Sequence, residues 1–265
     1  MSVAPAPVYQ AQAHWQSIEF ISDLHLRADQ PATFDRWFHY LQRTPADALF
    51  ILGDLFEFWP GDDVLEGGAD TAVESRCADV LLAASRHLSL FFMHGNRDFL
   101  IGERFASRCG LTLIEDPCVL SFAGQRWLLS HGDALCLDDV EYQRFRAQVR
   151  TPSWQQKFLA QPLDERRTQA QAIRQFSEAT KSSRKATGMA PADLDRDATR
   201  RWLQDAQANT LIHGHTHQPA RHDLGDGLSR VVLADWDASA DPPRGDVLRL
   251  RADEAHGEPS RLVPT

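Results

Sequence analysis

The stretch ALFILGDLFEFW, residues 48–59, joins a buried strand to a polar residue at the strand's end. Its first part, residues 48–54, is a short and nearly continuous apolar run, which is typical of a strand covered on both faces of a sheet. Gly53 and Asp54 end the run. A single aspartate in this place is usually a turn former or a helix cap, so it indicates a functional site only if the same pattern recurs along the chain.

The same arrangement recurs four more times along the chain. Apolar strand-like segments precede each of the other polar clusters, and ligands bind beyond the carboxyl ends of strands in open α/β sheets. Chance does not readily explain five such motifs, each directly after an apolar strand-like segment. In chain order, the motifs are DLH at 23–25, GD at 53–54, GNRD at 95–98, HGD at 131–133 and HGHTH at 213–217.

Composition sets the class of the protein. The chain has 265 residues, of which 43% are hydrophobic and 25% charged, so it can bury a large core and is neither fibrous nor disordered. A formal net charge of −9 lacks the basic footprint of a nucleic-acid binder. The sequence has no 18-residue apolar run, so no transmembrane helix is expected, and the first residues lack the pattern of a secretory signal. The four cysteines form no CxxC pair, which is typical of reduced thiols in a cytosolic protein.

The order of elements predicts an α/β fold with a helical insertion. Helical patterns at 32–43 and 70–87 alternate with strand-like segments, whereas strand signals almost vanish from 138 to 207. Strand-like segments return at 210–217. The predicted parts are a disordered lead-in at 1–17, a body at 18–137 and 208–254, a helical insertion at 138–207 and a disordered tail at 255–265.

Side chains in the five motifs could bind two metal ions. Two carboxylates, one amide oxygen and four imidazoles are too many ligands for one ion, and a bridging carboxylate would hold two ions roughly 3.5–4 Å apart. Mixed oxygen and imidazole ligands suit Mn²⁺, Fe²⁺, Co²⁺ or Zn²⁺. Arg97 adds a planar cation that can donate to phosphate oxygens, which favours phosphoester hydrolysis. The candidate ligands are Asp23, His25, Asp54, Asn96, His131, His215 and His217.

As an ordered set, DLH, GDLFEFW, GNRD, SHGD and GHTH resemble the motifs of the calcineurin-like metallophosphoesterases. The resemblance implies an αββα sandwich with a dinuclear centre at the strand ends. Within that family, the segments FISDLHL, LFILGDLFEFWPGDD, MHGNRDFLIGERFA, LSHGDALCLDD and LIHGHTHQP are similar to those of the UDP-2,3-diacylglucosamine diphosphatases. These enzymes cut a pyrophosphate in lipid A biosynthesis, releasing UMP and the lipid monophosphate, with water attacking the phosphorus on the uridine side.

The resemblance also implies roles for individual residues and two manganese ions per chain. Catalytic roles would fall to Asn96, Arg97 and His131. One ion would be held by Asp23, His25, Asp54 and His217, and the other by Asp54, Asn96, His131 and His215, so that Asp54 bridges. Substrate contacts would come from Asn96, Arg97, Asp139, His215 and, on the insertion, Ser177, Lys181 and Arg184, with Lys185 as the competitor of Arg184.

Several expectations concern partners. The resemblance implies a lipid-linked sugar nucleotide as substrate and peripheral contact with the cytoplasmic face of the inner membrane, without nucleic acid or an obligate protein partner. Apolar positions in the insertion either pack it onto the body or form a groove for acyl chains. They are Phe145, Val149, Trp154, Phe158, Leu159, Ile173 and Phe176.

Two alternatives stay open. One is a soluble metallophosphodiesterase or nucleotide pyrophosphatase of the same family, and the other is a scaffold built on a decayed fold. The complete set of metal-competent residues argues against decay. Because every metal-binding motif lies outside the insertion, we also expect the insertion to be dispensable for cleaving small phosphoesters.

Overall fold

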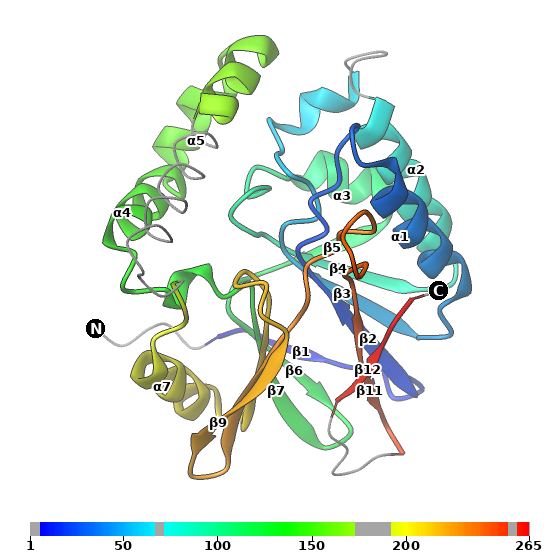
Figure 1. Ribbon diagram of the computed structural model, residues 1–265, viewed down its shortest axis with the longest axis vertical. Helices are drawn as coiled ribbons and strands as arrows, with labels where there is room; N and C mark the ends of the chain where they lie inside the picture. Colours follow the sequence, from blue (N-terminus) through cyan, green and yellow to red (C-terminus); the bar gives the residue numbers. More distant parts are fainter. Residues whose placement is uncertain (1–5, 67–71, 173–191, 254–258, 265) are drawn as a thin grey trace.

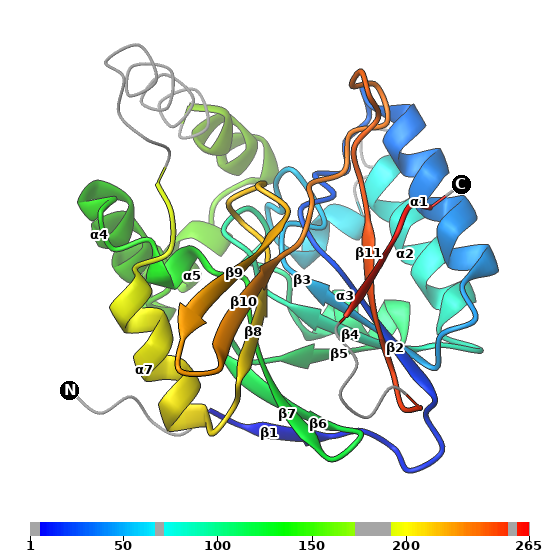
Figure 2. The ribbon, with the colours of Figure 1, turned by 60° about the horizontal axis from the view of Figure 1, so that its bottom comes forward.

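The computed structural model describes residues 6–66, 72–172, 192–253 and 259–264. Two six-stranded sheets stack face to face, and helices cover the outer face of each (Figures 1 and 2). The strand orders are β12-β11-β2-β3-β4-β5 in one sheet and β1-β6-β7-β8-β10-β9 in the other. This architecture is the αββα sandwich that the family resemblance implied. Within the described residues, no helix is long and apolar enough to cross a membrane.

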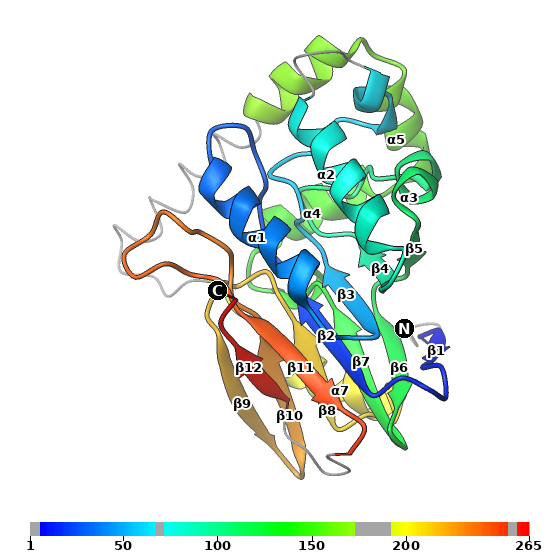
Figure 3. The same cartoon turned by 90° about the vertical axis from the view of Figure 1, so that its right-hand side faces the viewer.

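The sheet that contains β2 and β3 is parallel from β2 to β5, and β11 and β12 extend it in antiparallel fashion. All residues of β2 and β3 are buried, because helices cover one face and the second sheet covers the other (Figure 3). Its strands are β2 (Ser17–Ile21), β3 (Ala48–Leu52), β4 (Ser89–Met93), β5 (Leu111–Ile114), β11 (Val247–Arg251) and β12 (Ser260–Leu262). The helices against it are α1 (Pro31–Arg43), α2 (Ala72–Ala84) and α3 (Glu103–Cys109), with the 3₁₀ helix η1 (Asp62–Glu66) beside them.

The other sheet has a parallel centre, formed by β7, β8 and β10. Antiparallel hairpins attach β6 to β7 and β9 to β10, and Ala123 and Gly124 both have positive φ in the first turn, as a two-residue hairpin loop requires. Its strands are β1 (Val8–Gln10), β6 (Cys118–Phe122), β7 (Gln125–Ser130), β8 (Thr210–His213), β9 (Ala220–Gly225) and β10 (Leu228–Val232). The helix α7 (Arg196–Ala206) covers its outer face, and η3 (Asp133–Leu135) follows β7.

Three apolar clusters hold these layers together. The cluster between the sheets joins Phe20 and Phe50 of one sheet to Leu120 and Ile212 of the other. A second cluster lies between β2–β5 and the helices α1, α2 and α3, and a third lies under α7. Because both sheets have parallel centres, the loops after β2, β3, β4, β7 and β8 meet at one edge of the sandwich, where they build the site described below.

The structure corrects the expected lead-in and tail. Residues 8–10 form β1, which pairs with β6 and is itself the edge strand of its sheet, and Trp15 is buried between the sheets. At the other end, residues 260–262 form β12 beside β11. Each strand has three residues, too few to show the alternation by which a strand is recognised, and each forms because an exposed edge strand supplies backbone partners.

The described helices of the insertion fall into two groups. α4 (Val140–Val149), α5 (Pro152–Leu159) and helical residues 163–172 stand apart from α7, which packs on a sheet through Ala198 and Leu203 (Figure 1). Asp139 caps α4 by accepting a hydrogen bond from the backbone N–H of Tyr142 at 3.2 Å. The predicted contacts Ser177, Lys181 and Arg184, with Lys185, Ile173 and Phe176, lie outside the described residues.

Candidate metal centre

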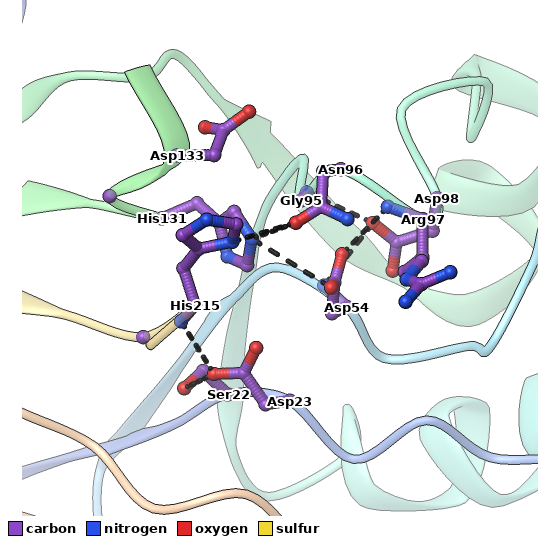
Figure 4. Close-up of polar contacts among 12 residues, drawn as sticks. Ser22, Asp23, Asp54, Gly95, Asn96, Arg97, Asp98, His131, Asp133 and His215 are labelled. Atoms are coloured by element: carbon purple, nitrogen blue, oxygen red, sulfur yellow. Dashed lines mark hydrogen bonds and ion pairs between the residues drawn. The ribbon is translucent and has the colours of Figure 1, made fainter. Parts of the chain in front are cut away.

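The five sequence motifs meet at one edge of the sandwich (Figure 4). Asp23 follows β2, Asp54 follows β3, Asn96 follows β4, His131 follows β7 and His215 follows β8. Several of the candidate ligands have a left-handed backbone, which costs roughly 1–2 kcal/mol per non-glycine residue. Strain of this kind concentrates at functional sites. The φ angles are 55° at Asp23, 49° at His25, 55° at Asp54, 69° at His215 and 54° at His217.

Two glycines in the motifs allow the loops to approach closely. A Cβ atom on Gly95 would lie 2.1 Å from Oδ1 of Asp54, and one on Gly214 would lie 2.3 Å from Oδ2 of Asp23. Both contacts are too short for any side chain. The glycines of GNRD and HGHTH are therefore needed where the two carboxylates are seated.

The first group of candidate ligands is Asp23, His25 and His217, whose ligand atoms lie within 4.8 Å of one another. Oδ1 of Asp23 is 3.2 Å from Nε2 of His217 and 3.9 Å from Nε2 of His25. Oδ2 accepts hydrogen bonds from Ser22 Oγ at 2.6 Å and from the His215 backbone N–H at 2.9 Å. Oδ1 is buried and accepts no hydrogen bond from the described residues, so it is placed to bind a cation beside the two imidazoles.

The second group surrounds Asn96. Its Oδ1 lies 3.0 Å from Nε2 of His131 and 2.8 Å from Nδ1 of His215. Asp54 lies beside them, with Oδ2 3.8 Å from Nε2 of His131. Nδ1 of His131 lies 2.9 Å from the Leu52 carbonyl, and donation of a hydrogen bond there leaves Nε2 available as a ligand.

Asp23 of the first group also lies close to two residues of the second. Ligand atoms of Asp23, Asp54 and His131 also lie within 4.8 Å of one another, so Asp23 belongs to both sets in this geometry. All seven candidate ligands thus lie around one site, whereas the bridging role of Asp54 stays a prediction.

Burial dominates the electrostatics of the site. It raises the pKa of Asp54 to about 7, although the charge of His131 opposes the shift. Burial alone would lower the pKa of His131, but the carboxylates of Asp54, Asp23 and Asp133 raise it to about 9. Burial, with the charge of His131, lowers the pKa of His215 to about 3 and keeps its ring neutral. The carboxylates and imidazoles strongly affect one another's pKa in this buried place, and together with the amide oxygen of Asn96 they are a donor set that fits divalent cations.

Three further carboxylates support the ligands, and the sequence analysis did not single them out. Glu57 lies 3.5 Å from Nδ1 of His25 and 3.6 Å from an amino group of Arg97. Asp98 is fully buried and accepts backbone hydrogen bonds from the loops after β3 and β4. Asp235 lies 3.8 Å from Nδ1 of His217. Glu57 and Asp98 are parts of the quoted motifs, and Asp235 follows β10 in the same strand-end pattern, so this signal was present in the sequence.

Arg97 and Asp139 are predicted substrate contacts, and Arg97 lies next to a candidate ligand. The backbone N–H of Arg97 donates to Oδ1 of Asp54 at 2.8 Å, and its side chain lies beside Glu57 at the rim of the site. Asp139 caps α4 at the base of the insertion. Contact of either side chain with substrate stays a prediction.

Comparison with known proteins agrees with this geometry. The model of the family described as calcineurin-like phosphoesterase matches residues 17–219. A UDP-2,3-diacylglucosamine hydrolase from Stenotrophomonas maltophilia is 42% identical, covering 88% of this chain and 94% of the relative, and one from Aromatoleum aromaticum is 45% identical, covering 86% and 92%. A dimetal phosphatase structure from Danio rerio, 14% identical with a TM-score of 0.50, covers 94% of this chain and 99% of its own and supports the fold alone. The chain therefore belongs to the calcineurin-like phosphoesterase family.

Proposed function

We propose that this chain is a metal-dependent hydrolase that cleaves the pyrophosphate of UDP-2,3-diacylglucosamine in lipid A biosynthesis, releasing UMP and 2,3-diacylglucosamine 1-phosphate. Identity of 42–45% to hydrolases named for this substrate, over most of the chain, carries the proposal. The convergence of all seven candidate ligands at one edge supports it, because membership in the family implies a dinuclear metal site.

The ions are two Mn²⁺, a choice that the oxygen and imidazole ligands favour without excluding similar ions. Asp23, His25, Asp54 and His217 hold one ion, and Asp54, Asn96, His131 and His215 hold the other. Bound divalent ions neutralise a pyrophosphate and lower the pKa of water so that it can attack phosphorus.

The other polar side chains position the substrate. Arg97 lies beside Glu57 at the rim of the site and donates hydrogen bonds to phosphate oxygens. Water attacks the phosphorus on the uridine side. Asn96, Asp139 and His215 contact the substrate from the body and the base of the insertion. Ser177, Lys181 and Arg184 contact it from residues outside the described ranges.

The acyl chains bind between insertion and body. The rings of Trp154 and Phe158 stack on each other, and Trp154 also contacts Phe99 of the body. These contacts favour the view that Trp154 and Phe158 pack the insertion onto the body. Leu137 and Val140 flank Asp139 and are exposed, so they are better candidates for acyl contact. A doubly acylated substrate also supports a peripheral location on the cytoplasmic face of the inner membrane.

One assay tests the activity. The purified protein is incubated with Mn²⁺ and UDP-2,3-diacylglucosamine in ¹⁸O-water, and the products are separated and weighed. We expect UMP that carries the label and an unlabelled lipid phosphate. Label in the lipid phosphate would reverse the site of attack. Equal cleavage of a UDP-sugar without acyl chains would favour the soluble nucleotide pyrophosphatase instead.

A further inference from the structure

Helix α4 belongs to the insertion, yet its side chains reach the loops that carry metal ligands. The relevant ligands are Asn96, His131 and His215, here called the Asn96 cluster because two rings meet its Oδ1 at 2.8 and 3.0 Å. Three side chains recur every four residues along α4 and therefore lie on one face of it, the last of them at the C-terminal cap. They are Tyr142, Arg146 and Arg150.

Two of these residues hold the loop of His131. Nε of Arg146 donates to Oδ2 of Asp133 at 2.8 Å, and the hydroxyl of Tyr142 donates to the same oxygen. Asp133 is fully buried and lies two residues after His131. Gln143 adds a hydrogen bond to the carbonyl of Asp133 at 2.8 Å. The first two turns of α4 therefore hold both the backbone and the side chain of Asp133 in this loop.

The same face reaches the other two ligands of the cluster. The ring of Tyr142 stacks on the ring of His215, with centroids 6.1 Å apart and planes at 30°. The guanidinium of Arg150 donates to the carbonyl of Gly95 at 2.8 Å, and Gly95 directly precedes Asn96. Arg150 also lies 5.1 Å above the ring of Phe99. Each loop of the Asn96 cluster thus contacts α4.

We propose that Tyr142, Arg146 and Arg150 are positioning residues that set the geometry of the Asn96 cluster, so that the insertion is needed to bind the second ion and to cleave any phosphoester. Ligand side chains must be held within about 0.5 Å of their working geometry, and loss of a residue that orients ligands typically lowers metal affinity 10- to 100-fold. This inference replaces the expectation that the insertion is dispensable for small substrates. It rests on the proposed two-ion site, and it does not depend on the lipid substrate.

The test compares Arg146→Met, Arg146→Lys and Tyr142→Phe with the control Arg144→Met, which changes an exposed arginine of the same helix. Metal-free protein is titrated with Mn²⁺ by calorimetry, and hydrolysis of bis(p-nitrophenyl) phosphate is measured at limiting and at excess Mn²⁺. For Arg146→Met we expect a 10- to 100-fold loss of affinity at one of two ions and slower hydrolysis that excess Mn²⁺ restores. Arg146→Lys, which keeps a donor for Asp133, should recover part of the affinity.

Two results would overturn the proposal: wild-type affinity for both ions in Arg146→Met and Tyr142→Phe, or an equal loss at both ions. If circular dichroism shows that Arg146→Met does not fold, Tyr142→Phe decides, because it removes a single hydroxyl group. None of these measurements uses the UDP-lipid. Failure to cleave that lipid would therefore refute the proposed function and leave this test unaffected.

Discussion

Removal of the Asp98 carboxylate should weaken the fold at the metal site. Oδ2 of Asp98 accepts a hydrogen bond from the backbone N–H of Leu55 at 2.7 Å, and Oδ1 accepts one from Gly95 at 2.9 Å. Longer hydrogen bonds join it to the N–H groups of Asp54 at 3.3 Å and Phe56 at 3.4 Å. This single buried side chain therefore ties the loop after β3 to the loop after β4.

The size of the effect follows from the groups left behind in Asp98→Ala. An unpaired buried N–H costs about 1–3 kcal/mol, so the two short hydrogen bonds together account for roughly 2–6 kcal/mol. The two long ones add little. We expect the free energy of unfolding to fall by about 3–5 kcal/mol. Asp98→Asn keeps one acceptor and turns an amide donor toward N–H groups, so it should cost about half as much.

Urea unfolding in the presence of EDTA measures this quantity without a contribution from bound metal. Asp79→Asn is the matched control, because Asp79 pairs with Arg108 on the surface at 2.8 Å and such pairs contribute about 0–1 kcal/mol. A loss of stability in Asp98→Ala no larger than that in Asp79→Asn would refute this role of the Asp98 carboxylate.

Three other predictions follow from single residues. Asp54→Ala should abolish turnover and lower the metal content without changing the circular dichroism spectrum; near-normal turnover would contradict the two-ion assignment. Arg97→Ala should lower kcat roughly 10²-fold and keep both ions, as measured by elemental analysis, and metal loss would show that its role is different. Arg166→Met removes an ion pair with Asp63 and should destabilise the protein by about 1–3 kcal/mol in urea unfolding. The hydrogen bond from Arg166 lowers the pKa of Asp63, so this difference should shrink as the pH falls below about 4; a constant difference would exclude the pair as its source.

The strands and the convergence of the candidate ligands could be predicted because both depend on local sequence. A strand buried on both faces is mostly apolar, and the polar residue that follows it then marks the sheet edge, as Asp54 does after β3. The support of these ligands depends instead on contacts between distant residues. Tyr142 and Arg146 have ordinary helical spacing, and only the packed chain shows that both meet Asp133, or that Arg150 reaches Gly95 across 55 positions.

Most of the non-glycine residues with positive φ in the described structure lie at the site. Five candidate ligands have left-handed φ angles, and at roughly 1–2 kcal/mol each the combined cost is comparable to the whole stability of a domain. Contacts around the loops must offset this cost, and the described structure contains them: buried Asp98 holds two loops together, Gly95 and Gly214 admit the carboxylates, and α4 holds the Asn96 cluster. A substitution that relieved the strain would free the ligands to separate. The insertion and the body therefore act together at this edge, because α4 of the insertion contacts the loops of the body that carry candidate metal ligands.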